Sequence, residues 1–586
     1  MADVGSKPDL LSTIDLAAIA DPTLRALVTL LVNEIEAQRR TIEVLREQNV
    51  YLRKRLGVGP GGGGGGGGAG GAKGGGPGAV RNNAPKDKCS TKDRQNARAA
   101  LDAEKGIKPN QGQRGRPAGV RQIVIDEERD VATPPPGLPA DVEFKGYGEG
   151  RTVQDLVLKK HAIRFYVGSW YSPSEHKTYH AELPAGVRGS CGPQLLAYVL
   201  TCHNVLGATH SRLHEHLLDL GFVISAGALS NLLVTGHEAL HDEKDAMHRE
   251  AVSASAFVQM DDTSTKVNGK GAHCFTVGNP AFTSLVTQPS KDRVNAIGAL
   301  GGGSPEFVVN EEAIARAERI GVPASYLELM REMPFDVRMD GAALDAMVLE
   351  HIGKPGAGSL RLMREAMALT ALGLKITIPR GLMADGATTF DDITELRGGC
   401  GIHGGRHFSE LMPGVPQFQL ELADAKHRYW KIFERIERYR ESPTPREAQS
   451  IRAAFDRLVA HAYEYSPLRD VLGRMREHRE QLLWSLRYPF LPAENNLSER
   501  DLRGRAKKRD VSYGPRTWRG LRSWDTFQSI YGTLRKLGVG WWAFLCDRIE
   551  GRGTIQSLAS LAVEKLRALG IDSSVWELDA PVAHAA

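Results

Sequence analysis

Four polar side chains between positions 495 and 503 have the spacing of one helix face. In a helix that begins near Asn495, the residues Asn495, Asn496, Glu499 and Arg503 lie on neighbouring turns, because residues three and four apart are helix neighbours. The face offers two amides, one carboxylate and one guanidinium, and a run of basic residues follows it. Such a face has little to pack against in a core, but it suits a divalent metal beside a phosphate.

Two aspartates earlier in the chain each follow a short apolar run. Asp261 follows Phe257–Met260 and Asp340 follows Phe335–Met339, and both runs are typical of β-strands that end at the aspartate. Two strand ends and one helix start would bring three carboxylates together. Two Mg²⁺ ions, which prefer oxygen ligands, clamp the attacking and leaving oxygens in phosphoryl transfer. The pattern therefore predicts metal-dependent chemistry on phosphodiesters.

Four short motifs stand at these and neighbouring positions. They are Met260-Asp261-Asp262-Thr263, Asp340-Gly341, Cys400-Gly401-Ile402-His403 with Arg406 and Phe408, and Asn495-Asn496-Leu497-Ser498-Glu499-Arg500. With them the chain resembles a DDE-type transposase of the insertion sequence 66 family over nearly its full length. The resemblance implies an RNase H-like fold in which Asp261, Asp340 and Glu499 are the catalytic residues and bind two Mg²⁺ (or Mn²⁺) ions. It also implies cutting of transposon ends and joining of the 3′-hydroxyl to target DNA.

Two acidic positions depart from the usual motifs of that family. Asp262 replaces a glutamate, and Glu494 stands where an aspartate often precedes the two asparagines. Glu494 is therefore a rival for the third ligand position. Glu499 is preferred because the basic residue of the motif follows it. The roles of Asn495 and Asn496 beside these two glutamates stay open.

The family often has a cysteine-rich zinc ribbon ahead of its helical region. Residues 130–185 contain no cysteine, so no zinc is expected there, because zinc needs Cys or His ligands in close pairs. Cys400 and His403 have the spacing of half a zinc site, but no second pair is evident and a structural role is preferred. Alternatively, His403 and Arg406 approach the active site from a strand–helix junction.

Two basic segments interrupt a chain whose formal net charge is only +5. Residues 81–121 hold 11 Lys and Arg against 4 Asp and Glu, and residues 500–522 hold 9 against 2. Clustered positive charge indicates a polyanion partner, here double-stranded DNA in the form of transposon terminal repeats and target. The side chains after Glu499 are expected to contact phosphates near the scissile bond without reading the sequence. They are Arg500, Arg503, Arg505, Lys507, Lys508 and Arg509.

Three further features allow two interpretations each. Arg114-Gly115-Arg116-Pro117 has the core pattern of an AT-hook, in which Arg114 and Arg116 follow a narrow minor groove. A non-specific basic linker is the alternative. Trp518 and Trp524 either pack in the core, which is preferred, or stack on an unpaired base. Leu213–Leu220, Gly221 and a helix Ala226–Val234 capped by Ser225 resemble a helix-turn-helix or form an ordinary helical hairpin.

A heptad pattern over residues 21–56 predicts a parallel coiled-coil dimer. Apolar residues recur at seven-residue spacing in two interleaved series, with one Asn that favours a fixed register. The series are Leu24, Leu31, Gln38, Leu45, Leu52 and Val28, Ile35, Ile42, Asn49, Leu56.

The predicted fold class is an α/β RNase H-like catalytic core with a large helical insertion, preceded by the coiled coil, a β-rich segment and a helical DNA-binding region. A tail (1–20) precedes the coiled coil, and a Gly-rich tether with the AT-hook-like segment (57–122) follows it. The later parts are a β-rich segment (123–185), a helical region (186–250), the first part of the core (251–418), the insertion (419–490), the second part of the core (491–550) and a tail (551–586).

The composition narrows the function classes. No apolar run approaches the roughly 20 residues that a membrane-spanning helix needs, the first residues lack a signal-peptide pattern, and six scattered cysteines favour a reducing compartment. We therefore expect a cytoplasmic, nucleoid-associated bacterial protein with no membrane partner. A homodimer or higher oligomer and helper proteins from the same element are the other expected partners. The alternatives to a transposase are a catalytically silent DNA-binding derivative and a purely hydrolytic RNase H-like nuclease.

Overall fold

The computed structural model describes residues 160–578 continuously. Before them it describes Val28, residues 125–129 and isolated positions from 137 to 154. The predicted coiled coil (Val28 excepted), the tether and the AT-hook-like segment with Arg114 and Arg116 therefore lie outside the described residues. Among the helices of the described part, none is long and apolar enough to cross a bilayer.

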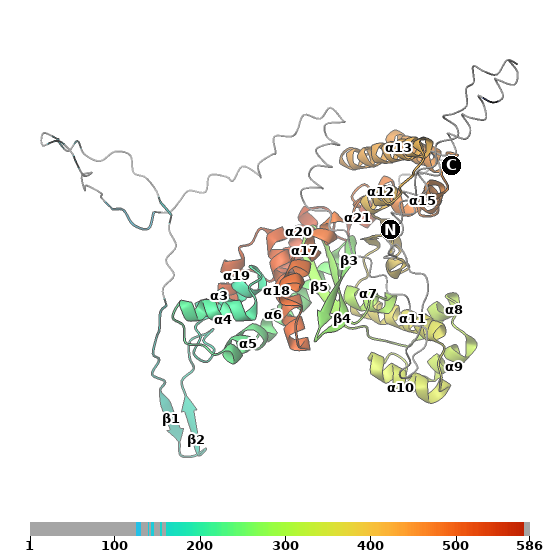
Figure 1. Ribbon diagram of the computed structural model, residues 1–586. Helices are drawn as coiled ribbons and strands as arrows, with labels where there is room; N and C mark the ends of the chain where they lie inside the picture. Colours follow the sequence, from blue (N-terminus) through green and yellow to red (C-terminus); the bar gives the residue numbers. More distant parts are fainter. Residues whose placement is uncertain are drawn as a thin grey trace, which may run out of the picture. The chain divides into compact units, whose positions relative to one another are not determined.

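A mixed sheet of five strands lies at the centre of residues 160–578, in the order β5-β4-β3-β6-β7 (Figure 1). β3, β4 and β5 are antiparallel neighbours, whereas β6 and β7 run parallel to β3. The β3–β4 turn, Asn268-Gly269, has positive φ at both residues, as a tight two-residue hairpin requires. The strands are β3 (Phe257–Val267), β4 (Lys270–Asn279), β5 (Phe282–Gln288), β6 (Gly381–Ala384) and β7 (Leu396–Gly399).

Two expectations about strands are changed by this sheet. The run Phe257–Met260 does form a strand, but β3 continues to Val267, so Asp261 lies inside it. Phe335–Met339 does not form a strand and makes only isolated bridges, from Phe335 to Val309 and from Met339 to Phe307. Phe335 and Val337 are 40% and 48% exposed. The parallel partner of β3 is β6, a strand of four buried residues.

Five helices connect β5 to β6. α11 packs against both α7 and α8, and in Figure 1 the group from α8 to α11 lies to one side of the sheet. The helices are α7 (Arg293–Leu300), α8 (Glu311–Arg319), α9 (Ala324–Glu332), α10 (Gly341–Ile352) and α11 (Ala357–Lys375).

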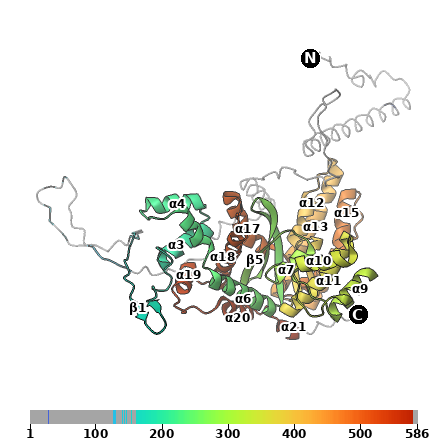
Figure 2. The same cartoon turned by 90° about the horizontal axis from the view of Figure 1, so that it is seen from below.

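A second helical group with its own hydrophobic core follows β7 and includes most of residues 419–490, the segment predicted as a helical insertion. α12, α13 and α15 lie together in Figures 1 and 2. Trp484 joins this group to the sheet, because its ring lies so close to Gly398 that a Cβ there would come within 2.3 Å of it. The elements are α12 (Gly401–Ser409), α13 (Pro416–Glu441), α14 (Pro445–Val459), α15 (Ser466–Glu477), α16 (Arg479–Leu482) and the 3₁₀ turn η4 (Trp484–Leu486). A further 3₁₀ turn, η3 (Thr388–Phe390), lies between β6 and β7.

α17 (Asn496–Ser512) packs on β3 and β4, and α18 (Trp518–Leu537) packs on β5. Side chains at four-residue spacing on α18 accept backbone N–H groups at alternate residues of β5. Thr533 accepts from Thr283 at 3.1 Å, Ser529 from Leu285 at 2.8 Å and Asp525 from Thr287 at 2.9 Å. The helix therefore covers an edge strand that would otherwise present unpaired N–H groups.

The segment before the sheet is helical, and the predicted cap of its third helix is confirmed. Ser225 accepts the Ala228 N–H at 3.1 Å at the start of α5, and Gly221 has φ +79° between α4 and α5. An earlier hairpin, β1 (Ser169–Ser172) with β2 (Lys177–His180), is the only strand pair of the described residues in 123–185, and 163–167 is not a strand. The remaining helices are α3 (Pro193–Asn204), α4 (His210–Asp219), α5 (Ala226–Val234), α6 (Glu238–Ala254), α19 (Trp541–Ile549), α20 (Leu558–Ala568) and α21 (Val575–Leu578).

The buried ion pair between Arg505 of α17 and Asp525 of α18 gives a stability prediction. Arg505 is 1% exposed, and its guanidinium also donates to Thr287 Oγ1 at 3.0 Å. Asp525→Asn would leave a buried cation without its carboxylate, so we expect a loss of about 3–5 kcal/mol in the free energy of unfolding. Denaturant unfolding followed by tryptophan fluorescence measures the change.

Asp510→Asn is the matched control, because Asp510 lies on the same α17 but is exposed and pairs only with Arg509. The control is expected to change the free energy of unfolding by less than about 0.5 kcal/mol. Equal effects of the two substitutions would contradict a structural role for the buried pair.

Candidate active site

Asp261 is a half-buried carboxylate of the candidate site. It lies in β3, and the backbone N–H of Asp262 donates to its Oδ1 at 2.8 Å. Burial raises the pKa of Asp261 to about 7, and the negative charges of Asp385, Asp262 and Glu499 act in the same direction. Two carboxylates from distant parts of the chain therefore lie close enough to Asp261 to affect its ionisation.

Asp385 reaches this position through the parallel pairing of β3 and β6. The register pairs Gln259 with Met383, and two residues further on Asp261 and Asp385 come side by side at the same end of the strands. The Asp385 carboxylate accepts the N–H of Ala387 at 3.0 Å, which closes a turn directly after β6. The Asp385-Gly386 pair was not recognised in the sequence, where Asp340-Gly341 was chosen instead.

Arg397 of β7 holds the backbone of the Asp385 turn. Its side chain is 9% exposed and donates to the carbonyl oxygens of Ala384, Asp385 and Gly398. One guanidinium thus ties the end of β6 to β7, and this contact fixes the position from which Asp385 extends.

Asp340, the predicted second ligand, lies elsewhere. It is the N-cap of α10, and its Oδ1 accepts the Ala343 N–H at 2.8 Å. Its residue neighbours belong to the helical connection between β5 and β6, and it is not among the charges that act on Asp261. The structure brings Asp261 and Glu499 together but does not bring Asp340 to them. The physical reason is that the run before Asp340 pairs with no strand of the sheet.

The start of α17 is attached to β3 by two hydrogen bonds. Asn495, which is 2% exposed, donates from Nδ2 to the carbonyl of Met260 at 2.8 Å. Gln259 donates from Nε2 to the carbonyl of Glu494, also at 2.8 Å. The attachment lies one residue before Asp261 in β3, so the first turn of α17 brings Glu499 next to Asp261.

Glu499 is held by Arg406 of α12. The guanidinium lies 3.0 Å and 3.2 Å from the two carboxylate oxygens, the geometry of a two-pronged pair. The charge of Asp261 also acts on Arg406, whose pKa is raised chiefly by its hydrogen bond to Glu499. Arg406 therefore contacts Glu499, one of the carboxylates predicted as a metal ligand.

The other polar residues near the start of α17 each make contacts of their own. Glu494 accepts from Asn496 Nδ2 at 2.7 Å, and burial and the charge of Glu437 raise its pKa. Cys400 is buried at the N-terminus of α12, and its sulfur accepts the Asn495 N–H at 3.2 Å. The ring of His403 lies 5.2 Å from that of His407.

The predicted phosphate contacts divide into exposed and buried groups. Arg500, Arg503 and Lys507 are exposed. Arg505 and Lys508, in contrast, are 1% and 4% exposed. They lie on the sides of α17 that face the sheet and α18, where burial among neighbouring elements decides their position.

The exposure of three further side chains, Arg509, Trp518 and Trp524, bears on the predictions made for them. Arg509 is half-buried and donates to the carbonyl of Ser264. Trp524 is a core residue with 5% exposure, as preferred, whereas Trp518 is 62% exposed.

Within the described part of the chain, no group of three or more His, Cys, Asp or Glu side chains is arranged to hold a metal ion. The donor chemistry nevertheless fits one. Asp261, Asp385 and Glu499 offer carboxylate oxygens, which Mg²⁺ prefers. A divalent cation would also offset the mutual repulsion of the negative charges that act on Asp261.

Two comparisons with known proteins bear on the family. Residues 188–276 match the model of the transposase IS66 family, a range that contains Asp261 but ends before Asp385 and Glu499. The uncharacterized protein y4jO of Sinorhizobium fredii is 27% identical over 326 residues, which cover 54% of this chain and 99% of that protein. The family resemblance drawn from the sequence motifs is therefore confirmed for residues 188–276, the part of the chain that matches the IS66 transposase family.

Proposed function

We propose that the chain is a metal-dependent DNA transposase whose catalytic carboxylates are Asp261, Asp385 and Glu499. The observation that carries the proposal is that the β3–β6 register and the attachment of α17 to β3 bring Asp385 and Glu499 to Asp261. The family match supports transposase-type activity in general. An RNase H-like organisation of the core is part of the proposal, and the sheet order β5-β4-β3-β6-β7 with β6 and β7 parallel to β3 supports it.

In this proposal the three carboxylates hold two Mg²⁺ or Mn²⁺ ions, which supply positive charge to the attacking and leaving oxygens of the phosphodiester. Arg406 lies at the same place and carries the positive charge that pairs with Glu499 in the structure. If metal ions were bound by the carboxylates, Arg406 would supply positive charge at the same place for a phosphate oxygen of the DNA. Arg500 and Arg503, both exposed on α17, add sequence-independent affinity for the backbone.

Two further parts of the proposal concern the partners. The coiled coil at residues 21–56 is proposed to form a homodimer or a higher oligomer, and Arg114 and Arg116 to bind DNA nonspecifically or in a narrow minor groove. Terminal repeats and target DNA are the proposed substrates, with helper proteins from the same element as additional partners.

Asp385 and Asp340 provide a direct test of the second ligand. Asp385→Asn should reduce Mg²⁺-dependent nicking of transposon-end DNA by at least about 1,000-fold, because it removes a metal-binding charge. Asp340→Asn is the matched control, since asparagine is as good an N-cap as aspartate and should preserve α10. Activity is measured as the rate of strand nicking on a labelled duplex. Loss of activity in the Asp340 variant with an active Asp385 variant would overturn the assignment.

Glu499 and Glu494 are tested as a pair. Glu499→Gln should abolish nicking, whereas Glu494→Gln should retain most of the activity, because Glu494 pairs with Asn496 instead of approaching Asp261. Binding of the same end DNA, measured in EDTA, should change little in either variant. An active Glu499 variant beside an inactive Glu494 variant would identify Glu494 as the third ligand.

The raised pKa of Asp261 gives a prediction about metal and stability. Because the folded protein holds this proton more tightly than the unfolded chain, stability without metal should fall as the pH rises from about 4 to about 7. Asp261→Asn should remove that loss, on the order of 1–3 kcal/mol, and should unfold at a higher temperature than the parent at pH 8 in EDTA.

Addition of Mg²⁺ at pH 8 should then raise the melting temperature of the parent protein but not that of the Asp261→Asn variant, because only the parent has the buried charge to offset. Thermal unfolding followed by circular dichroism measures both. An equal response of the two proteins to Mg²⁺ would contradict metal binding at Asp261.

A further inference from the structure

A pocket lies on the side of α17 that faces away from Glu499. Its volume is about 560 Å³, and residues of α17, α18, β5 and the turn after α3 line it. Lys508, in its wall, follows Glu499 by nine residues, which is about two and a half helical turns. The two side chains therefore leave α17 on opposite sides, and the pocket is separate from the carboxylate site.

Positive charge dominates the wall of this pocket. Only one carboxylate, Asp501, lines it, and that carboxylate already accepts from Lys536 Nζ at 2.6 Å and Thr283 Oγ1 at 2.8 Å. Six lining side chains are basic, namely Arg500, Arg505, Lys507, Lys508, Arg535 and Lys536.

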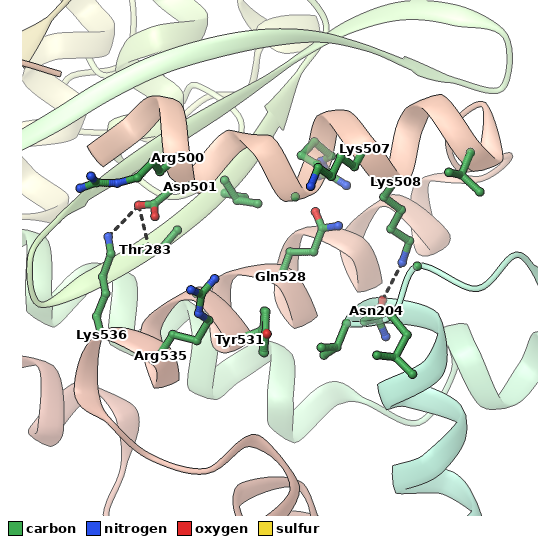
Figure 3. A pocket seen from close by; sticks show the side chains of 18 of the residues that line it. Asn204, Thr283, Arg500, Asp501, Lys507, Lys508, Gln528, Tyr531, Arg535 and Lys536 are labelled. Atoms are coloured by element: carbon green, nitrogen blue, oxygen red, sulfur yellow. Dashed lines mark hydrogen bonds and ion pairs between the residues drawn. The ribbon is translucent and has the colours of Figure 1, made fainter. Parts of the chain in front are cut away.

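Three of these cations are exposed and border the pocket from two helices. Figure 3 shows Arg500 and Lys507 on α17 facing Tyr531 and Arg535 on α18. Within the part of the chain that the structure describes, none of the three cations forms an ion pair with a carboxylate. The guanidinium of Arg535 lies over the Tyr531 ring, 5.8 Å from its centre. The pocket thus presents positive charge to solvent from both sides.

The inner wall has more donors than acceptors. Lys508, 4% exposed, donates to Asn204 Oδ1 at 2.9 Å and lies 4.4 Å from the centre of a Trp524 ring. Burial holds the pKa of Lys508 well below its usual value. Asn204 Nδ2 and Arg505 Nη1 are buried N–H groups with no partner. A half-turn of the Gln528 amide, whose oxygen is also unpartnered, would add another donor.

From this surplus of cations and donors around one cavity, we propose that the pocket binds backbone phosphates of a DNA segment other than the one at the carboxylates. Phosphate oxygens supply both the acceptors and the negative charge that the wall lacks, and arginine side chains bind them in two-pronged pairs. The inference rests on the proposed function in taking DNA as the partner. The turn after α3 also leads into α4 and α5, the helix pair predicted as a helix-turn-helix, so the pocket adjoins a second candidate DNA surface.

The test is the salt dependence of DNA binding by the full chain in EDTA, where no cleavage occurs. Lys507→Ala/Arg535→Ala removes one exposed cation from each helix. For a long duplex of random sequence, we expect the slope of log K against log salt to decrease by about 2, with at least about a tenfold loss of affinity. Arg535→Ala alone, which alters only the α18 side, should give about half of the slope change.

Arg319→Ala/Arg567→Ala is the matched control, because both residues are exposed, lie on α8 and α20, and line neither site. It removes the same charge and should change the slope by less than about 0.5. A pocket variant that behaves like this control overturns the proposal, whereas a slope change confined to the pocket variant supports it.

Inorganic phosphate and pyrophosphate separate a DNA backbone from a free small anion as the source of the phosphate. Both should raise the melting temperature of the parent more than that of the pocket variant and should compete with the duplex. Stabilisation by phosphate together with an unchanged DNA slope would mean that the ligand is a small anion, and the DNA assignment would be overturned. No difference between the variants in either assay would mean that the pocket takes no phosphate.

The same measurements distinguish this inference from the proposed function. A slope change in the pocket variant without Mg²⁺-dependent nicking by the parent would support the DNA pocket and contradict the transposase assignment. A chain that nicks DNA through Asp385 without a slope change would retain the activity and lose the pocket.

Discussion

The attachment of α17 to β3 is the contact on which the candidate site depends. Gln259 and Asn495 each donate a side-chain amide N–H to the other segment's backbone, across 235 residues of sequence. The Asn495 N–H also donates to the sulfur of Cys400, where the helical insertion leaves the sheet. These three bonds close the insertion at its base, so its own core can pack outside the sheet without moving Glu499. Helix rigidity then transmits the position of Asn495 to Glu499 one turn later.

The strongly polar helix α17 contacts three different parts of the structure. Glu499 lies on the side of Asp261 and Arg406, Leu502 and Arg505 pack on the sheet, and Lys508 lines the phosphate pocket proposed above. Because the helix has almost no apolar face, hydrophobic burial alone cannot choose its rotation about its axis. Specific pairs do so instead, chiefly the buried guanidinium of Arg505 with Asp525. A buried charge that is paired in only one rotation penalises every other rotation strongly.

The sequence was sufficient for the elements with strong local signals. The cap of α5 at Ser225 and the start of α17 near Asn495 agree with the capping residue and the spacing in the sequence, and most of residues 419–490 is helical. The second carboxylate of the proposed site did not follow, because Asp340-Gly341 and Asp385-Gly386 are the same dipeptide after a short apolar run. The difference is tertiary, since β6 has four residues and owes its strand conformation to pairing with β3 and β7. A run as short as Gly381–Ala384 carries no period that could identify it.

Burial of Arg505 and Lys508 could not be read from the basic run either, although the helical period gave a hint. Arg505 stands three residues after the apolar Leu502, on the same side of the helix. What decides the burial is that Asp525, Asn204 and Trp524 are present to receive the two cations, and these residues come from elements far apart in sequence.

The same dependence on partners explains why Asp261 and Glu499 have different charged neighbours. Glu499, the more exposed carboxylate, already has the guanidinium of Arg406 as its counter-charge. Asp261, inside β3, accepts an N–H from Asp262, and burial together with the charges of three carboxylates raises its pKa. In the metal site proposed above, a bound cation would share Glu499 with Arg406 and would favour loss of the proton from Asp261. Arg406 would then link occupancy of that proposed site to the positive charge available for DNA.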